Sequence, residues 1–395
     1  MATPERPPDF PPERLADTRP VRPVVQHTLL ELRGGAARVA GLLAHGLTRL
    51  GRASRRVFEV PETFTGQSRL AAEPWREGLL GAMTQGEILH VHSTADWVEL
   101  LGLLAGRSGR SGQAGRVVLT LHDMSLLTGG CAYAMDCAGF GQGCVDPCPR
   151  GFPESAAQRR LQAQALAGLS PLLVTPSRWL KGLAEAALPG ASVTVIPNGV
   201  EWPSETFSRR EAKKALGLAP EARLALFVAH GGSQAAYKHG GAWLDIWRGI
   251  KARVPAAVGF FVGGQEQSRL EGDLALWPFM EQAQLRRFLA GADVLVYPSL
   301  ADNHPLLILE AMAQRCPVVA HAVGGIPEQI THDRTGLLAR PGDDAALVAA
   351  AAEVLLSPSK GRALAEEAWG RGRTHFCAAR MVEDHIKLYA GLDAV

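Results

Sequence analysis

The sequence predicts an α/β protein with two domains, each a doubly wound parallel sheet covered by helices. Three observations support this prediction. The chain has 395 residues, which is too long for one ordinary hydrophobic core and suits two domains of roughly 150–200 residues. Short apolar runs that end at Gly, Pro or polar residues precede helical stretches, as buried parallel strands do. A polar and charged segment, residues 201–222, is expected to link the first domain to the second.

Composition describes a globular protein and argues against several functions. Hydrophobic residues are 47% and charged residues 20% of the chain, and the formal net charge is +2, so no global basic field indicates nucleic-acid binding. No apolar run reaches the ~18 residues of a membrane span, and the N-terminus lacks the apolar region of a secretory signal. We therefore expect a cytoplasmic protein, in which six cysteines indicate thiols or metal more than disulfides.

The amino-terminal domain is expected to cover residues 23–203, after a disordered Pro- and Arg-rich tail, residues 1–22. Its first strand, residues 24–30, is followed by Gly34 and Gly35 at the start of a helix. Glycines at such a turn let the backbone approach a ligand closely, although many ordinary turns also contain such a pair. No GxGxxG fingerprint is present, so a dinucleotide cofactor is not supported.

Basic residues gather on and after this first helix. A solvated helix face explains them most simply, and peripheral contact with an anionic membrane is the alternative. The residues are Arg38, Arg49, Arg52, Arg55 and Arg56.

Two further strands carry histidines. His90 and His92 alternate along one strand and are expected to be packed or hydrogen-bonded rather than ligands. The next strand, residues 116–121, ends at His122 and Asp123. Ligands bind beyond the carboxyl ends of strands in open α/β sheets, so these two residues are site candidates. Asp123 is expected either to orient His122, to take a proton from a bound substrate, or to cap a turn.

A Cys-rich loop, residues 131–148, follows these site candidates. Four thiolates on a short loop suit a tetrahedral, structural Zn²⁺ with no open position for catalysis. Disulfides and free thiols are the alternatives, since the spacing is not that of paired CxxC motifs. The four residues are Cys131, Cys137, Cys144 and Cys148. Cys316 and Cys377 read as ordinary buried thiols.

The carboxy-terminal domain is expected to cover residues 204–377, and its most informative stretch is 294–328. A buried strand leads into a polar loop containing Asp302, and Pro305 then opens a helix that carries Glu310 on its second turn. Free N–H groups at a helix start bind anions, and a nearby carboxylate can accept hydrogen bonds from the hydroxyls of a sugar. The two together indicate a nucleotide site, whereas the simpler alternative is an ordinary strand–loop–helix unit.

The remaining elements follow from periodicity and from Gly, Pro and Ser signals. Strands are expected at 172–174, 224–229, 256–264 and 317–320, and helices at 155–166, after Ser177, 345–356, 361–372 and 378–392.

The 294–328 stretch resembles the acidic motif of glycosyltransferase family 4, whose members are retaining enzymes of the GT-B fold. In that family two glutamates lie eight positions apart, the second of them opens an EAMA segment, and PVVA and GG-x-x-E segments follow. Here EAMA begins at Glu310, PVVA at Pro317 and GGIPE at Gly324, while Asp302 stands at the position of the first glutamate.

This resemblance, which covers roughly residues 24–392, implies two Rossmann-like α/β/α domains facing a cleft, with residues 378–395 returning to the first domain. It implies a retaining hexosyltransferase that moves sugar from a UDP- or GDP-sugar to a glycan or lipid-linked glycan. A similar Cys-rich loop occurs in a subset that resembles enzymes of exopolysaccharide synthesis. No DxD-like metal cage is evident, so no cofactor is expected to be required for catalysis.

The resemblance also implies roles for individual residues. Catalytic candidates are His122, Asp123, Asp302 and Lys238; donor-binding candidates are Gly34, Gly35, Asn198, Lys238, His304, Leu306, Leu307 and Glu310. The arginine that usually accompanies the diphosphate-gripping lysine is replaced by glycine or serine, and His230, His239 and Arg33 are candidates to compensate. Other functions remain open: a sugar-nucleotide epimerase or phosphorylase on the same fold, or a non-catalytic scaffold that binds nucleotide sugars.

Overall fold

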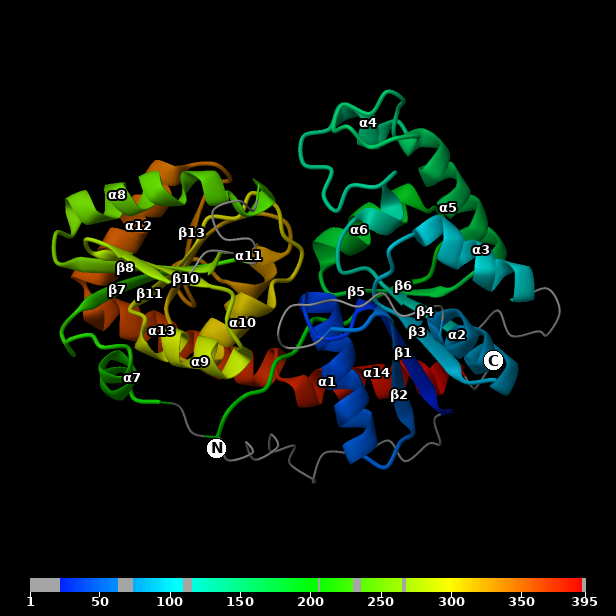
Figure 1. Cartoon of the computed structure of the whole chain (residues 1–395), viewed down its shortest axis with the longest axis horizontal. Coiled ribbons are helices and arrows are strands. Elements are labelled where there is room, and N and C mark those ends of the chain that lie inside the picture. Colours follow the sequence, from blue (N-terminus) through cyan, green and yellow to red (C-terminus); the bar gives the residue numbers. More distant parts are fainter. Residues whose placement is uncertain are drawn as a thin grey trace. The chain divides into compact units, whose positions relative to one another are not determined.

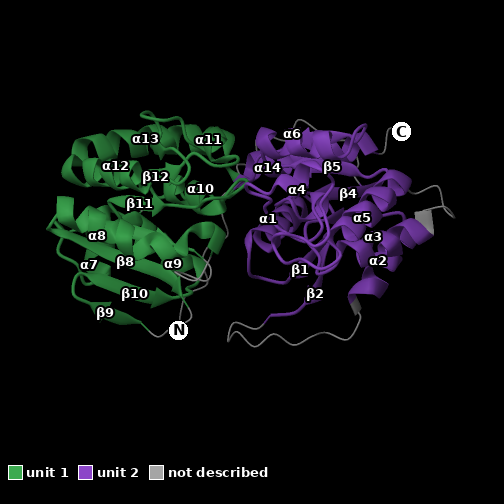
Figure 2. Cartoon of the chain, turned by 90° about the horizontal axis from the view of Figure 1, so that it is seen from above, with its two compact units in different colours: residues 1–9, 200–377 green, residues 10–199, 378–395 purple. Residues whose placement is uncertain are grey.

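The computed structural model describes residues 22–62, 74–108, 116–204, 207–229, 236–264 and 268–392. These residues form two compact units, coloured separately in Figure 2. Val200–Cys377 lie in the carboxy-terminal unit, and the described residues up to Gly199 and from Ala378 onward form the amino-terminal unit. The predicted tail and His230 lie outside the described residues, apart from Arg22.

The amino-terminal unit contains a parallel sheet of six described strands in the order β2-β1-β3-β4-β5-β6 (Figure 1). The strands are β1 (Val24–Leu30), β2 (Ser54–Val60), β3 (Ile88–Val91), β4 (Val117–Thr120), β5 (Leu172–Thr175) and β6 (Val193–Val195). The helices are α1 (Gly35–Arg49), α2 (Pro74–Gln85), α3 (Trp97–Ser108), α4 (Ala138–Gly141), α5 (Ser155–Leu169), α6 (Arg178–Ala187) and α14 (Ala378–Leu392), with a short 3₁₀ turn η3 (Ser125–Leu127).

The carboxy-terminal unit contains seven described strands in the order β13-β12-β11-β7-β8-β10-β9, of which only β9 is antiparallel to its neighbour. The strands are β7 (Arg223–Val228), β8 (Ala257–Gly264), β9 (Arg269–Glu271), β10 (Leu274–Pro278), β11 (Val294–Tyr297), β12 (Val318–His321) and β13 (Leu337–Ala339). The helices are α7 (Arg209–Ala215), α8 (Trp243–Arg253), α9 (Gln282–Gly291), α10 (Leu306–Ala313), α11 (Ile326–Gln329), α12 (Asp344–Leu356) and α13 (Pro358–His375), with the 3₁₀ turns η5 (Ala236–Lys238) and η6 (Gly240–Ala242).

Helices cover both faces of the carboxy-terminal sheet, with α8 and α12 on one side and α9, α10 and α13 on the other (Figure 1). The core on the first side is formed by Phe227, Trp243, Ile250, Val296 and Leu347, all at most 2% exposed. All four residues of β3, β4, β11 and β12 are buried, which explains why these strands are mostly apolar in sequence.

The last helix, α14, belongs to the amino-terminal unit and has the bounds that the sequence predicted. It packs against α1, where Gly46 lies so close to Val382 that a Cβ at Gly46 would stand 2.5 Å from a valine methyl group. The absence of a side chain at Gly46 therefore lets the two helices approach closely.

The predicted basic group after α1 is divided by a strand that the sequence did not indicate. Arg55 and Arg56 lie on β2. Arg55 pairs with Glu87 at 2.7 Å, and the guanidinium of Arg56 donates to the carbonyl oxygen of Glu31. Within the described ranges, none of the helices has both the length and the apolar character needed to cross a membrane.

Candidate active site

A buried loop and helix hold several of the predicted donor-site residues in the carboxy-terminal unit. Helix α10 begins at Leu306, and Pro305 occupies its N-cap, where no intrahelical N–H is needed. Asp302, His304 and Glu310 are only 6%, 4% and 5% exposed. Polar side chains this deeply buried require hydrogen-bond or charge partners, so the segment is built around polar contacts.

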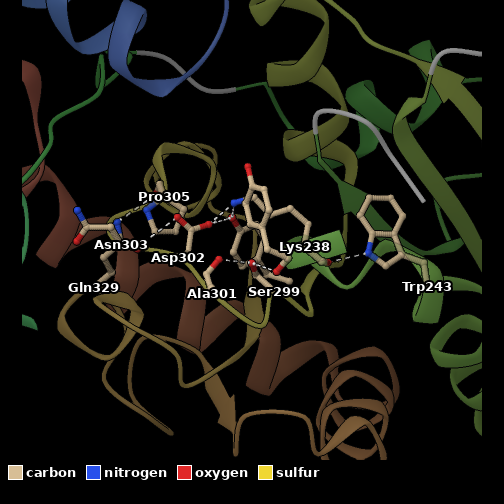
Figure 3. Close-up of polar contacts among 10 residues, drawn as sticks. Lys238, Trp243, Ser299, Ala301, Asp302, Asn303, Pro305 and Gln329 are labelled. Carbon is tan, nitrogen blue, oxygen red and sulfur yellow. Dashed lines mark hydrogen bonds and ion pairs between the residues drawn. The ribbon is translucent and has the colours of Figure 1, made fainter. Parts of the chain in front are cut away.

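Lys238 and Asp302 form the centre of these contacts (Figure 3). The Lys238 ammonium donates to Asp302 Oδ2 and, at 2.9 Å, to the hydroxyl of Tyr297. The Tyr297 hydroxyl donates to the same carboxylate oxygen at 2.5 Å, and Asp302 Oδ1 accepts the N–H of Asn303 at 2.9 Å. Two predicted site residues that are 64 positions apart in the sequence therefore meet in the structure.

The turn that carries Lys238 is fastened to the loop after β11. The carbonyl oxygen of Tyr237 accepts the N–H of Leu300 at 2.9 Å and the hydroxyl of Ser299 at 3.2 Å. Trp243 of α8 donates its indole N–H to the Lys238 carbonyl at 3.3 Å (Figure 3). These bonds fix the backbone of Lys238 beside the loop, so the ion pair is held by the fold and not by the side chains alone.

His304 is oriented by Gln329 of α11. The Gln329 amide donates to the Pro305 carbonyl at 3.1 Å and to His304 Nδ1 at 2.9 Å. A carbonyl oxygen only accepts, so the Gln329 atom at this position is the amide nitrogen, and Nδ1 of His304 is the acceptor. A neutral His304 therefore carries its proton on Nε2, which makes that nitrogen a donor.

The first turn of α10 contains Leu306 and Leu307, which the sequence also predicts to bind the nucleotide-sugar donor. Leu306 is buried and Leu307 is half-buried. Their backbone N–H groups are among those that an α-helix leaves without an intrahelical acceptor. The sequence predicts an anion site at this helix start, and Glu310 follows one turn later.

Two candidates for the missing phosphate-binding cation already face carboxylates. Arg33 pairs with Glu62 at 2.5 Å, in the amino-terminal unit. Burial opposes ionisation of Glu62, but the backbone N–H groups of Arg33 and Leu32 and the Arg33 side chain hold its pKa below the usual value. His239 lies 2.9 Å from Asp344. Among these candidates and Lys238, only the lysine touches the polar cluster around Asp302.

The amino-terminal unit places Gly34 and Gly35 where a ligand could approach the backbone. Gly34 is the N-cap of α1, with φ of 90°, a conformation that favours glycine. No described atom lies within 4 Å of a Cβ built on either glycine. The start of α1 is therefore open among the described residues, as an anion site requires.

His122 and Asp123 follow β4, as predicted, and both are half-buried. Asp123 Oδ1 accepts the N–H of Ser125 at 2.8 Å, so the carboxylate caps the turn that begins η3. Burial raises the pKa of Asp123 and lowers the pKa of His122 to about 3. His122 Nε2 lies 3.0 Å from His92 Nδ1, a partner that the sequence did not suggest.

Asn198 lies just before the chain enters the carboxy-terminal unit and is 6% exposed. Arg380 of α14 donates to the carbonyl oxygens of Pro197 and Asn198, at 2.6 and 3.2 Å. Asn198, which the sequence predicts to contact the nucleotide-sugar donor, is thus held in place by α14.

The four cysteines of the Cys-rich loop line one pocket, together with Phe140 and Phe152. They are free thiols, and no three His, Cys, Asp or Glu side chains of the described chain are arranged to hold a metal ion. As placed, the thiols do not form the tetrahedral set that the sequence predicted. Backbone N–H groups of Arg150 and Phe152 lower the pKa of Cys148, whereas burial raises that of Cys131.

The two cysteines outside the loop differ from each other. Cys316 is fully buried, as predicted, and burial raises its pKa to about 12. Cys377 is only half-buried, which differs from the prediction, and it lies where the chain passes from one unit to the other.

Comparison with known proteins gives a family match to the part of the chain that contains Lys238, Asp302 and α10. Residues 225–357 match the family described as glycosyl transferases group 1. The D-inositol 3-phosphate glycosyltransferase of Actinosynnema mirum is 31% identical over 203 residues, which are 46% of this chain and 48% of that protein. The chain thus spans about half the length of this relative.

Solved structures resemble the whole described fold. Sucrose-phosphate synthase from Thermosynechococcus elongatus superposes with a TM-score of 0.71 at 17% identity, covering 94% of this chain and 99% of the other. Anabaena HepE in complex with UDP gives a TM-score of 0.67 at 15% identity, covering 94% and 100%. The chain has the GT-B fold that these solved structures share, and its segment 225–357 matches the model of the glycosyl transferases group 1 family.

Proposed function

We propose that this protein is a glycosyltransferase that moves a sugar from a nucleotide-sugar donor to a hydroxyl acceptor, with retention of configuration. The observation that supports this function best is the cluster at the start of α10, where Lys238, Asp302 and His304 surround a helix N-terminus within the family-matched segment. Glu310, buried one turn later, is a carboxylate suited to the hydroxyls of a ribose.

The chemistry explains why these groups are needed. The bond between the anomeric carbon and the phosphate oxygen breaks as the acceptor oxygen bonds to that carbon, and the acceptor proton leaves with a phosphate oxygen or a base. Negative charge therefore grows on the departing diphosphate. The Lys238 ammonium, the Nε2–H of His304 and the N–H groups at the start of α10 are donors suited to that charge. Asp302 holds Lys238 in place before the donor arrives.

A donor screen tests this proposal. We expect a UDP- or GDP-sugar to raise the melting temperature, because a ligand that binds only the folded state stabilises it. UDP-sugars are tested first, since the structure of HepE contains UDP. A radiolabelled donor should then yield a labelled glycan or lipid-linked glycan. Isomerised donor without acceptor would indicate an epimerase, and binding without hydrolysis or transfer would indicate a scaffold.

We also propose that the exposed end of α1 meets an anionic membrane at its surface, so that lipid-linked acceptors are within reach. Arg49 is exposed and Arg52 half-exposed at this end of the helix. Arg55, which is also exposed, and Arg56 lie on the following strand. Flotation with vesicles containing phosphatidylglycerol should carry the protein upward, and Arg49→Glu together with Arg52→Glu should abolish this. Protein that stays at the bottom would exclude the contact.

Zinc in the Cys-rich loop stays a prediction. The four thiols share one pocket but would have to move toward a common centre to bind a metal. Elemental analysis of protein purified under reducing conditions decides between about one zinc per chain and none. No catalytic step depends on this site.

A further inference from the structure

A chain of buried polar side chains runs from His122 into the core of the amino-terminal unit. His122 Nε2 lies 3.0 Å from His92 Nδ1, and His92 Nε2 lies 2.8 Å from the Gln26 amide oxygen. The Gln26 amide nitrogen donates to the Tyr389 hydroxyl at 3.3 Å. Tyr389 is 2.6 Å from His90 Nδ1, and His90 Nε2 is 2.6 Å from a threonine hydroxyl. We call this the histidine relay; its members are His122, His92, Gln26, Tyr389, His90 and Thr120.

The relay is sealed from water behind His122. Its other five members are at most 4% exposed. Burial holds the pKa values of His90 and His92 well below the usual value, and their mutual repulsion with His122 and His385 adds to this. Each of the three imidazoles is therefore neutral at neutral pH, with one nitrogen that donates and one that accepts.

Neutrality makes the tautomers of the relay depend on one another. The Gln26 oxygen can only accept, so His92 carries its proton on Nε2. His92 Nδ1 then accepts, and the proton between the two histidines must belong to Nε2 of His122. The Gln26 amide, which accepts from His92 and donates to Tyr389, therefore sets the direction of every hydrogen bond in the relay.

The inner half of the relay has the same direction. The Gln26 amide donates to the Tyr389 hydroxyl, which is then able to donate to His90 Nδ1. His90 consequently carries its proton on Nε2 and donates to Thr120. Relay residues come from strands β1, β3 and β4 and from helix α14. The fold as a whole therefore fixes the tautomer of His122.

We propose that His92 is a positioning residue that holds His122 as the Nε2–H tautomer, so that His122 Nδ1 acts as a hydrogen-bond acceptor for a hydroxyl of the bound sugar. The role toward sugar rests on the proposed function, whereas the tautomer does not. The assignment also means that His122 recognises a hydroxyl and does not serve as a general acid at neutral pH.

The tautomer can be measured directly. In protein with ¹⁵N-labelled histidine, long-range ¹H–¹⁵N correlation spectra distinguish a protonated ring nitrogen from an unprotonated one, and His122→Gln identifies the His122 signals. We expect Nε2 of His122 to be protonated and Nδ1 to be unprotonated. Protonation at Nδ1 instead would overturn the proposal. No donor or acceptor is needed, so this result is independent of transferase activity.

Two variants of His92 and one control variant separate a positioning role of His92 from a role in packing alone. His92→Phe removes the acceptor and should leave His122 as a mixture of tautomers. It should also lower kcat/KM for transfer by about tenfold, the loss expected for one hydrogen bond. His92→Asn keeps an acceptor near the Nδ1 position and should restore the tautomer.

The matched control is His385→Phe. His385 is as buried as His92 but donates to the Met381 carbonyl and has no place in the relay. It should leave the His122 tautomer unchanged. A His122 tautomer that is unaffected in folded His92→Phe protein would refute the positioning role. Absence of transfer in every protein, with the expected tautomer intact, would refute the proposed function alone.

Discussion

At the scale of single residues, Lys238 differs from an ordinary surface lysine because its charge is already paired. Its side chain and that of Asp302 are 18% and 9% exposed. Removing one partner of a shielded pair leaves the other charge poorly solvated, so the pair acts as a unit. Asp302 is thus tied to Lys238 by geometry.

Replacing this lysine should weaken donor binding. We expect Lys238→Ala and Glu310→Ala each to reduce affinity for the nucleoside diphosphate by roughly 10- to 100-fold, since a hydrogen bond to a charged group contributes about 1.5–3 kcal/mol. Isothermal titration calorimetry measures the effect. Lys214→Ala, at an exposed position on α7, is the control and should bind normally. Unchanged affinity in both site variants would invalidate the proposed donor site.

The buried histidines predict a pH dependence of stability. Burial lowers the pKa of His27 and His122 to about 3 and of His385 to about 4. The unfolded chain binds protons near pH 6.5, and the folded chain does not, so stability is present above that pH and is lost as pH falls toward 4. Each histidine contributes a slope of about 1.4 kcal/mol per pH unit below pH 6. Glu59, whose pKa burial raises, acts in the opposite direction.

Urea unfolding at pH 7.5, 6.5 and 5.5 measures this slope, with amide exchange in β1 and β3 reporting on the amino-terminal unit. His385→Leu removes one such histidine and should reduce the slope by about 1.4 kcal/mol per pH unit, the contribution of one proton. Stability that does not change between pH 7.5 and 5.5 would contradict the buried, neutral state of these rings.

At the scale of elements, predictability followed burial. The bounds of β1, β11 and α14 were predicted within a residue because apolar residues mark both ends of β1, β11 is an apolar run, and the helix has a clear periodicity. Strand β2 was missed because it is an edge strand, SRRVFEV, with mostly part-exposed positions and two arginines. The site was predicted as separate residues, whereas their partners are set by long-range contacts. The bond between His92 and His122 joins residues 30 positions apart, and sequence periodicity contains no information on it.

The contact between α1 and α14 gives an element-scale prediction. Alanine normally stabilises a helix interior by about 1 kcal/mol relative to glycine. At Gly46 it should destabilise instead, because its methyl group would stand 2.5 Å from Val382. Overpacking of this kind costs about 1–3 kcal/mol. Adding Val382→Ala to Gly46→Ala should recover part of the loss, as measured by thermal unfolding.

The control for this pair is Gly81→Ala on α2, where a Cβ meets no described atom within 4 Å. That variant should be neutral or slightly more stable. Gly46→Ala that matches it would show that α1 and α14 do not approach as closely as the structure indicates.

At the scale of the whole molecule, the described part of the chain passes between the two units twice, and the two passages are paired. Val200 and Cys377 form a parallel bridge, in which the Val200 N–H donates to the Phe376 carbonyl at 2.9 Å. After the second passage the chain forms α14, its last described helix, which completes the amino-terminal unit. The fold of the amino-terminal unit thus depends on α14, whereas the fold of the carboxy-terminal unit does not.

A chain ending at Cys377 tests that inequality. It lacks Met381, Val382, Ile386 and Tyr389, each at most 1% exposed. Burial of such side chains contributes about 1.5–3 kcal/mol each, so their sum is comparable to the whole stability of a domain, about 5–15 kcal/mol. We expect amide protection to be lost in β1 and β3 and retained in β11 and β12, as measured by hydrogen exchange. Val200–Cys377 contain all of the second sheet and its core, and so do not require α14. Equal loss of protection in both sheets would mean that the units fold as one cooperative body.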